Sequence, residues 1–322
     1  MKTMQATAEA HPNIALVKYW GKRDVPGNVP ATPSLSITLD TLRTRTRVTF
    51  DATLPARQVV LNGKRVNDAK IDACLDRLIE RARRPLPPVS VETDNNFPTA
   101  AGLASSASGF AALVTAVDAA LGLSLSAEER AQEARRASAS AARSLYGGFV
   151  SLTGTEDPAS WLACPELDAA AWPLKVVIAI CTDEPKAVSS SAGMLMSKTS
   201  PYYDRWTEVA GRDFEAARRA VVSRDFAGLA RIAEENCLAM HAVMLSARPS
   251  LIYWTGATIE CIRRVQQLRT AGTPVFFTID AGPQVKAVCE PAAVEIVREA
   301  LASIPSVKQV LVAGLGGPAR VV

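Results

Sequence analysis

The sequence has few residues of the kinds from which metal centres, disulfide frameworks and membrane spans are built. It holds only two histidines, His11 and His241, and none of its six cysteines belongs to a Cys-x-x-Cys pair. This scarcity argues against a histidine-rich metal site, and the cysteines are expected to be buried free thiols in a reducing compartment. Neither a signal peptide nor a run of about 18 apolar residues is visible, so the sequence predicts a soluble cytoplasmic protein that does not enter a membrane.

A strong charge of one sign is also lacking. The net charge is +4, and the basic residues are spread along the chain instead of forming a stripe interleaved with aromatics. Nucleic-acid binding is therefore not expected, whereas a modest positive balance suits a small anionic substrate. Aromatic residues make up only 6%, but 322 residues that are 48% hydrophobic suffice for a large core and predict two domains.

The order of the expected helices and strands indicates an α+β protein. Short strands occupy much of the first 61 residues, and Asn62-Gly63 marks a tight hairpin turn. A helix is expected over 68–84, and it is followed by a strand at 89–93, a helix at 107–121 and a helix after Ser126.

An apolar strand at 174–181 is followed by the polar Thr182–Pro185, so we place a domain boundary there and divide the chain into 1–183 and 184–322. The second part is expected to order its helices and strands as a split β-α-β sandwich. Its helices are expected at about 205–222, 226–246, 255–271 and 291–303, and its strands at 274–279, 285–289 and 307–313.

A turn rich in small residues runs from Pro98 through Gly102 to Ser105 and Ser106, and leads directly into the Ala-rich helix. Small side chains let a backbone approach a ligand closely, and the N–H groups and positive dipole of a helix start bind phosphate. The two serine hydroxyls could contact phosphate oxygens or a magnesium ion, although the Gly-Lys-Ser/Thr of a Walker A loop is missing. The same pattern would also fit a tightly packed helix start that binds nothing.

Cations and a tyrosine lie together near the N-terminus, as Lys18, Tyr19, Lys22 and Arg23. Strand alternation would place Lys18 and Trp20 on one face and Tyr19 on the other. The group could cradle a diphosphate, or its lysines could be ordinary solvated residues at a strand edge.

Two further polar segments could bind anions. Between Ser138 and Gly148, small hydroxyls surround Arg143, whose guanidinium can fork onto a carboxylate or phosphate. The same segment could instead be a helix end with a glycine turn. Residues 186–194 have the composition of a polar loop.

Asp280 stands at the end of an apolar strand, directly before an Ala-Gly-Pro turn. An acid in this position is often a plain turn cap. It could also be a general base held rigidly at the rim of a sheet.

Together these segments resemble the mevalonate diphosphate decarboxylase family. The matching stretches are HPNIALVKYWGKRD, NNFPTAAGLASSASGFAAL, RSLYGGFV, Lys-x-Val-Ser-Ser and TIDAGP, in the family's order from residue 11 to 283. The resemblance implies the GHMP-kinase fold, with a left-handed β-α-β unit in the N-terminal domain, a ferredoxin-like C-terminal domain and the active site in the cleft between them. It also implies that ATP, with Mg²⁺, phosphorylates the 3-hydroxyl of 5-diphosphomevalonate, after which phosphate and CO2 leave and isopentenyl diphosphate remains, a step of the mevalonate pathway of isoprenoid biosynthesis.

The resemblance also implies roles for individual residues. Asp280 would accept or orient the hydroxyl proton, Arg143 beside it would hold the substrate carboxylate and keep the aspartate ionised, and Lys18 would add positive potential. The substrate phosphates would be held by Tyr19, Lys22, Ser138, Ser140, Ser189 and Ser190. ATP would be contacted by Asn96, Pro98, Ala101, Gly102, Leu103, Ala104, Ser105 and Ser106, of which either serine could reach the magnesium ion. A homodimer is expected because dimers are common in this family and among soluble oligomers.

Several positions depart from the family's pattern. Alanines stand at 137 and 139 where glycines are usual, Thr32–Ser36 replaces an Asn-Ser-Ser-Leu-Ser stretch, and Ser191 stands where some bacterial members carry an arginine. Gln284 also replaces a usual asparagine. The first three differences lie around the substrate phosphates, so the sequence leaves open whether the substrate is 5-diphosphomevalonate or 5-phosphomevalonate, which would yield isopentenyl phosphate. The sequence is also compatible with a kinase that stops at the 3-phosphate and with a non-catalytic metabolite-binding module.

Overall fold

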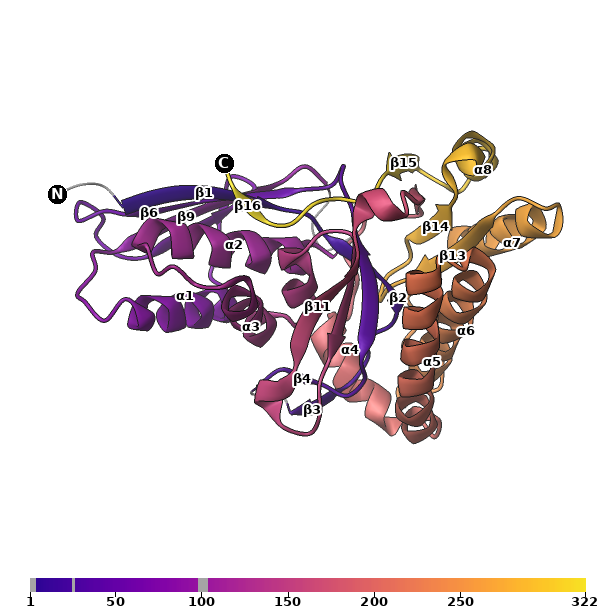
Figure 1. Cartoon of the computed structure of the whole chain (residues 1–322), viewed down its shortest axis with the longest axis horizontal. Helices are drawn as coiled ribbons and strands as arrows, with labels where there is room; N and C mark the ends of the chain where they lie inside the picture. Colours follow the sequence, from indigo (N-terminus) through magenta and orange to yellow (C-terminus); the bar gives the residue numbers. More distant parts are fainter. Residues whose placement is uncertain (1–3, 25–26, 98–103) are drawn as a thin grey trace.

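The computed structural model of the chain describes residues 4–24, 27–97 and 104–322. Two lobes lie side by side along the long axis in Figure 1, the first built mainly from the N-terminal half and the second from the C-terminal half. Three sheets of four or more strands organise them.

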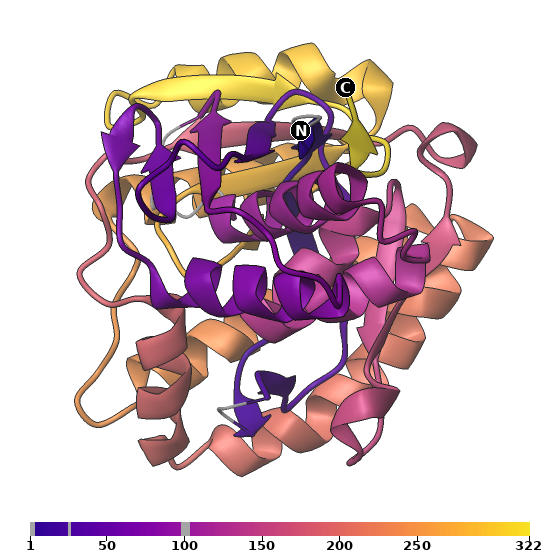
Figure 2. The same cartoon turned by 90° about the vertical axis from the view of Figure 1, so that its left-hand side faces the viewer.

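A six-stranded sheet forms the outer layer of the first lobe, in the order β16-β1-β6-β9-β7-β8. Its strands are β1 (Met4–Ala10), β6 (Thr44–Phe50), β7 (Gln58–Leu61), β8 (Lys64–Arg65), β9 (Val89–Asn95) and β16 (Arg320–Val321). Helix α2 (Ser105–Leu121) packs on β1 and β6, and helices α1 (Ala69–Arg81) and α3 (Ala127–Ala137) pack against α2. Figure 2 shows these layers end on, with the strands above α2 and α1 below it.

Local sequence explains these elements. Side chains of β6 alternate between the core and solvent, with Val48 buried and Arg47 exposed, as expected for a half-buried strand. Asn62 and Gly63 have φ values of 48° and 73°, which fits the hairpin turn between β7 and β8 that the sequence predicted. Strands β7 and β9 pair in parallel with α1 between them, so this lobe contains a β-α-β unit.

A four-stranded sheet, β11-β10-β5-β2, joins the two lobes. Its strands are β2 (Asn13–Val17), β5 (Ser34–Thr38), β10 (Phe149–Thr153) and β11 (Leu162–Leu167), and a small hairpin of β3 (Lys22–Asp24) and β4 (Val29–Pro30) follows β2. Every residue of β2 and β5 is buried, because the strands are contacted both by helices α5 (Tyr203–Ser223) and α6 (Phe226–Leu245) of the second lobe and by the 3₁₀ segment Ala139–Leu145 of the first. One hydrophobic cluster includes Leu16 and Phe149 of this sheet together with Phe214 and Phe276 of the second lobe.

The second lobe has an antiparallel sheet in the order β13-β14-β12-β15. Its strands are β12 (Lys175–Ile180), β13 (Val275–Ile279), β14 (Val285–Cys289) and β15 (Gln309–Ala313). Counted along the chain, this is the 4-1-3-2 arrangement of a ferredoxin-like sheet, which confirms the predicted split β-α-β sandwich. Its helices are α4 (Ser190–Met196), α5 (Tyr203–Ser223), α6 (Phe226–Leu245), α7 (Gly256–Thr270) and α8 (Val294–Ala302). Short 3₁₀ segments lie before β12 at η1 (Ala139–Leu145), η2 (Pro158–Ser160) and η3 (Ala169–Ala171), and after it at η4 (Ser197–Thr199) and η5 (Pro291–Ala293).

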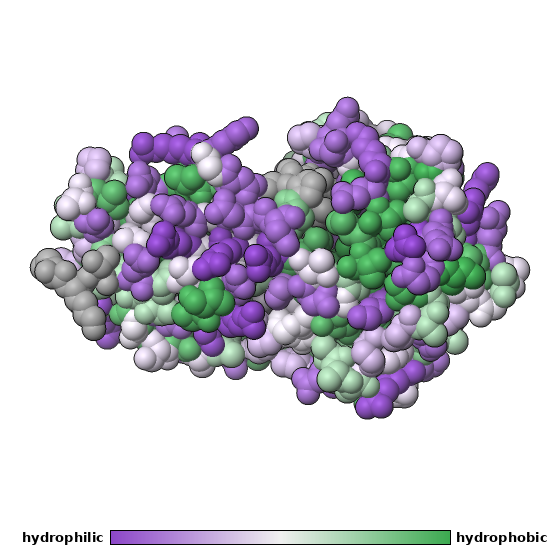
Figure 3. Space-filling model, turned by 90° about the horizontal axis from the view of Figure 1, so that it is seen from above, coloured by the Kyte–Doolittle hydropathy of each residue, from purple (hydrophilic) through white to green (hydrophobic). Residues whose placement is uncertain are grey.

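Two strands do not belong to the lobe that their position in the chain suggests. The predicted boundary after residue 183 falls beyond β12. Because β12 is a central strand of the sheet of the second lobe, we propose a boundary between β11 and β12 instead. At the other end of the chain, β16 returns to the first lobe and pairs with β1. Seen from above, the space-filling view in Figure 3 shows the two lobes separated by a waist.

No helix in the described part of the chain is both long enough and apolar enough to cross a membrane. All six cysteines are free, and five of them are buried as the sequence predicted, whereas Cys164 is exposed.

Candidate active site

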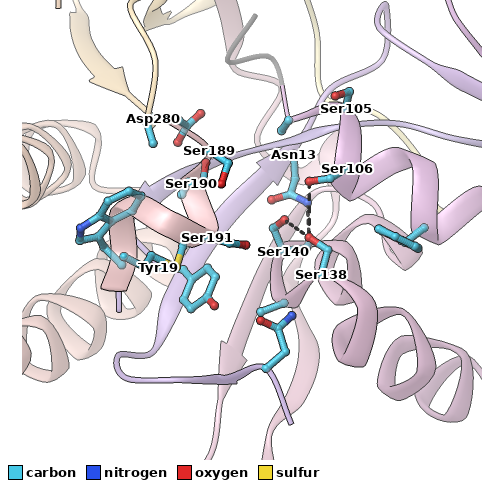
Figure 4. A pocket seen from close by; sticks show the side chains of 18 of the residues that line it. Asn13, Tyr19, Ser105, Ser106, Ser138, Ser140, Ser189, Ser190, Ser191 and Asp280 are labelled. Atoms are coloured by element: carbon cyan, nitrogen blue, oxygen red, sulfur yellow. Dashed lines mark hydrogen bonds between the residues drawn. The ribbon is translucent and has the colours of Figure 1, made fainter. Parts of the chain in front are cut away.

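A cavity of about 490 Å³ lies between the lobes and is lined by residues of both. Among its lining residues are the following that the sequence had singled out: Lys18, Tyr19, Lys22, Ala104, Ser105, Ser106, Ser138, Ser140, Arg143, Ser189, Ser190 and Asp280. Figure 4 shows Asp280 and the serines at 189–191 on one side of the space, facing Ser105, Ser106, Ser138 and Ser140 on the other. Among the described lining residues, five are cationic and only Asp68 and Asp280 are acidic, so the cavity suits a polyanionic ligand.

Asp280, directly after β13, forms ion pairs with two buried lysines. Lys18 Nζ lies 2.7 Å from Asp280 Oδ1, and Lys286 Nζ lies 3.2 Å from Asp280 Oδ2. Burial alone would raise the pKa of the Asp280 carboxyl, but the two ammonium groups outweigh it and hold that pKa well below its usual range. About 25% of the Asp280 side chain stays exposed, so a ligand in the cavity can reach an ionised carboxylate.

Lys286 was missed by sequence reasoning. It lies in the middle of β14, opposite Thr278 of β13, and its side chain is 1% exposed. A lysine inside the otherwise apolar run Val285–Cys289 was the available signal, because a buried cation needs an anionic partner.

The side-chain hydrogen bonds of Arg143, in η1, go to groups other than Asp280. Its guanidinium donates to the hydroxyls of Ser34 and Ser36 and, at 3.2 Å, to Asn13 Oδ1. Burial lowers the Arg143 pKa to about 10, although the charge of Asp280 acts to raise it. The two charges therefore sense each other, but the groups that keep Asp280 ionised are the two lysines.

A second group of cations converges on Ser191. Lys22 Nζ and Lys70 Nζ lie 3.5 Å and 3.3 Å from Ser191 Oγ. Burial and the neighbouring charge of Lys70 lower the pKa of Lys22. Two like charges around one hydroxyl mark a place where an anion would be stabilised. Lys70, in the first turn of α1, was not among the residues that the sequence singled out.

Lys186 and Ser189 lie in the segment directly before α4, and α4 itself occupies part of the stretch 186–194 that the sequence had predicted to be a polar loop. Ser189 Oγ accepts a hydrogen bond from Ala192 N and so caps the helix. Lys186 Nζ donates to Ser190 Oγ at 2.7 Å and to Ala281 O at 3.0 Å, which places its charge beside the Asp280 turn. Burial lowers the pKa of Lys186, while Asp280 acts to raise it.

Hydroxyl groups connect the start of α2 with η1. Ser106 Oγ lies 3.4 Å from Ser138 Oγ, which lies 3.2 Å from Ser140 Oγ (Figure 4). Among the described residues no side chain caps α2, whose N-cap Ala104 has a left-handed backbone conformation. The first turn of α2 therefore offers a positive dipole end to an anion in the cavity. Alanine is tolerated at 137 and 139 because both residues are helical, in α3 and η1.

Tyr19 also faces the cavity, although not through strand alternation. β2 ends at Val17, so residues 18–21 are irregular and the predicted two-face pattern is wrong. Burial raises the pKa of Tyr19 above its ordinary value, and its Oη has no hydrogen-bond partner within the described structure.

The remaining predicted ATP contacts divide into two groups. Pro98, Ala101, Gly102 and Leu103 lie outside the described residues. The Asn96 side chain is bonded to the backbone of Thr41 and Arg43 and does not line the cavity.

A smaller cavity of about 190 Å³ adjoins the first and shares residues with it at the start of α2. Ser105, Ser106 and Phe110 line both cavities. The smaller cavity is also lined by the apolar side chains Leu61, Ile71, Val91 and Leu113 and by three threonines, Thr44, Thr46 and Thr93. Such a slot suits a flat apolar group attached to an anion.

A metal ion would need help from a ligand to bind here. The described part of the chain contains no cluster of three or more His, Cys, Asp or Glu side chains that could hold one. Mg²⁺ needs few protein ligands when substrate phosphates and waters supply the rest. The serine hydroxyls and the sparse carboxylates of the cavity fit that arrangement.

Comparisons with known proteins agree with this geometry. Residues 10–163 match a family described as diphosphomevalonate decarboxylase-like N-terminal domain, and residues 176–312 match the mevalonate 5-diphosphate decarboxylase C-terminal domain. The diphosphomevalonate decarboxylase mvd1 of Aspergillus fumigatus is 37% identical over 303 residues, covering 87% of this chain and 75% of that protein. The human diphosphomevalonate decarboxylase is 36% identical over 302 residues, covering 86% and 74%.

Solved structures extend the likeness to the whole fold. The mevalonate diphosphate decarboxylase of Staphylococcus aureus superposes with a TM-score of 0.92 at 34% identity, covering 99% of this chain and 98% of that one. A structure of MDDEF in complex with MVAPP, AMPPCP and magnesium gives a TM-score of 0.92 at 37% identity and covers 99% of both chains.

Proposed function

Because the chain belongs to the diphosphomevalonate decarboxylase family, we propose that it converts 5-diphosphomevalonate and ATP into isopentenyl diphosphate, ADP, phosphate and CO2. The observation that carries the proposal is the ionised Asp280 carboxylate, held between Lys18 and Lys286 and exposed to a cavity rich in cations. The chain has the GHMP-kinase fold of those relatives.

Asp280 acts on the 3-hydroxyl of the substrate. A tertiary alcohol is a weak nucleophile, so an ionised carboxylate that accepts its hydrogen bond orients the oxygen towards the γ-phosphorus of ATP. The oxygen–phosphorus bond forms as the bond between the γ-phosphorus and the terminal oxygen of ADP breaks, and the hydroxyl proton passes to an oxygen of the transferred phosphate or to water. Because two lysines lower the pKa of Asp280, the carboxylate orients and polarises the hydroxyl and is a poor final resting place for its proton.

The phosphorylated intermediate then loses phosphate and CO2. The electron pair of the bond to the carboxylate carbon becomes the new double bond as the phosphate departs with its oxygen. Lys18 and Lys186 lie where they can stabilise negative charge on the transferred and departing phosphate. Arg143 uses three of its five N–H donors on protein groups, which leaves donors for the substrate carboxylate.

The cations around Ser191 support a diphosphate over a monophosphate. The serine at 191 removes an arginine that some relatives carry, but Lys70 reaches the same place from α1 and joins Lys22 there. Two ammonium groups match the charge of a second phosphate. Tyr19 also lines the cavity, and Ser138 and Ser140 supply further donors from its opposite side.

ATP fits the opposite wall. Its phosphates would meet the first turn of α2 and the hydroxyls of Ser105 and Ser106, and its base would enter the smaller apolar cavity. Ser105 and Ser106 are the residues best placed to share in holding magnesium. When bound, Mg²⁺ neutralises phosphate charge and aligns the γ-phosphate for transfer.

A substrate comparison tests the proposal. Purified protein with ATP and Mg²⁺ should release CO2 from 5-diphosphomevalonate with a kcat/KM at least about tenfold above that for 5-phosphomevalonate, since one lost charge contact is worth about 1.4 kcal/mol or more. ADP formed without CO2 would show a 3-kinase, and no turnover with either compound would show a binding module. The cytoplasmic location and the homodimer stay predictions from the sequence.

A further inference from the structure

Helix α6 contacts both segments that supply Lys18 and Asp280. It packs against β13, whose end carries Asp280, and against β2, which leads into Lys18. β13 is the outermost strand of its sheet, so the backbone groups on its outer edge need partners other than a neighbouring strand.

Side chains of α6 supply those partners. Glu234 Oε1 accepts a hydrogen bond from Phe277 N at 3.1 Å, and Cys237 Sγ accepts one from Ile279 N at 3.2 Å. The Cys237 thiol also donates to Ile279 O at 3.4 Å. Glu234 and Cys237 lie three residues apart on one face of α6. They thus bond to Phe277 and Ile279, which lie two residues apart along the edge of β13. Ile279 directly precedes Asp280, so these bonds fix the backbone from which the carboxylate projects.

Asn236, the neighbour of Cys237, holds the other segment. Asn236 Oδ1 accepts a hydrogen bond from Lys18 N at 2.7 Å, and Asn236 Nδ2 donates to Asp213 Oδ2 at 2.8 Å. On the other side, Lys18 O accepts a hydrogen bond from Thr32 Oγ1 at 3.3 Å. Asn236 is completely buried, so its amide has no water to exchange partners with.

We propose that Asn236 is a positioning residue for the decarboxylation, which together with its neighbour Cys237 fixes the backbones of Lys18 and Ile279 relative to each other. Lys18 and Asp280 come from different lobes, so their covalent connection does not fix their separation. Their separation is fixed by a single rigid helix, α6, because its adjacent residues Asn236 and Cys237 bond to the two segments. This role rests on the proposed function, because the separation matters only if Lys18 and Asp280 act together on a substrate.

Asn236→Ala tests the role. The variant should lose about 10²-fold in kcat for CO2 release from 5-diphosphomevalonate, because a displacement of about 1 Å at a reacting group costs about that much. The KM for ATP should not change, since ATP is held on the opposite wall of the cavity. A residue that only stabilised the fold would lower the amount of folded enzyme and leave the kcat of the folded fraction unaltered.

Exchanging the amide and the carboxylate between residues 236 and 213 should restore the activity. Asn236→Asp alone should be impaired, because it places a carboxylate against Asp213. Adding Asp213→Asn restores one acceptor for Lys18 N and one amide–carboxylate bond, so the double variant should recover most of the wild-type kcat. Glu235→Gln, an exposed neighbour on α6, is the matched control and should behave as wild type.

If Asn236→Ala does not fold, variants of Cys237 test the positioning role independently. Cys237→Ser keeps a donor and an acceptor for Ile279 and should retain kcat, whereas Cys237→Ala should lose it. Folded Asn236→Ala with unaltered kcat, or equal kcat for the two Cys237 variants, would overturn the positioning role. Failure of the wild-type protein to release CO2 would instead refute the proposed function.

Discussion

Lys18 Nζ lies 2.7 Å from Oδ1 of Asp280, although 262 positions separate the two residues in the chain. Each follows the end of a completely buried strand, β2 for Lys18 and β13 for Asp280. The Lys18 side chain is 1% exposed, so this contact replaces most of its solvation. The ion pair is therefore both a bridge between the lobes and the centre of the candidate chemistry.

Asp280→Ala should lower kcat by about three or more orders of magnitude, because it removes both the hydrogen-bond acceptor and its charge. It also leaves Lys18 and Lys286 near each other without an anion, so the rate must be normalised to the folded fraction measured by circular dichroism. Asp280→Asn keeps the shape of the side chain and should be impaired as well. Near-normal turnover in either folded variant would remove Asp280 from the reaction.

Lys286→Met should change the pH dependence of kcat. Burial raises the pKa of Asp280, and Lys18 and Lys286 together outweigh that effect, so the wild-type carboxylate stays ionised at a more acidic pH than an ordinary aspartate. Loss of one lysine should raise the Asp280 pKa by about one to three pH units. Because only the ionised form is active, kcat of the variant should fall on acidification where wild type does not. Superimposable kcat–pH profiles would show that Lys286 has no part in keeping Asp280 ionised.

The sequence was informative about Asp280 and Lys18 but gave no indication of Lys286, the second lysine partner of Asp280, for a physical reason. Strand ends and turns are local, so the apolar run before Asp280 and the Ala-Gly-Pro after it could be recognised directly. Lys286 approaches Asp280 only because β13 and β14 pair in one particular register. Lys70 reaches Ser191 only because α1 and α4 meet across the lobes. Such contacts depend on tertiary packing, which the spacing of residues does not encode.

The same distinction applies to the fold. Turn chemistry at Asn62-Gly63 and the capping box at Ser126 are local signals, and the hairpin and α3 follow them. The pairing of β16 with β1 joins the two ends of the chain. Strand β12 belongs to the sheet of the second lobe because it pairs with strands that come about a hundred residues later. Neither could be predicted from local pattern.

Lys70→Ala should raise the KM for the phosphorylated mevalonate by about tenfold and leave kcat at saturation largely intact. The expectation follows from the loss of one charge-assisted contact, worth about 1.5 kcal/mol, to a part of the substrate that does not react. Lys22→Ala should act in the same way. Lys64→Ala is the matched control, because Lys64 is an exposed lysine of β8 that does not line the cavity. An unaltered KM would remove Lys70 from the phosphate site.

His241→Gln should make stability less sensitive to acid. Burial lowers the pKa of His241 to about 3, so between about pH 6.5 and that value the unfolded chain binds a proton that the folded protein does not. Wild-type stability should therefore fall with decreasing pH in this window, by up to about 1.4 kcal/mol per pH unit from this residue alone. Urea unfolding at about pH 7 and about pH 4.5 should show a loss about 2 kcal/mol smaller in the variant. Equal losses would mean that His241 is protonated in the folded protein.

The ratio of CO2 to ADP in a single reaction tests the account most directly. With 5-diphosphomevalonate labelled at the carboxylate carbon, ATP and Mg²⁺, we expect one CO2 for each ADP, because the phosphorylated intermediate loses phosphate and CO2 before it leaves the cavity. ADP without CO2, or CO2 released without ATP, would contradict the reaction assigned to this site.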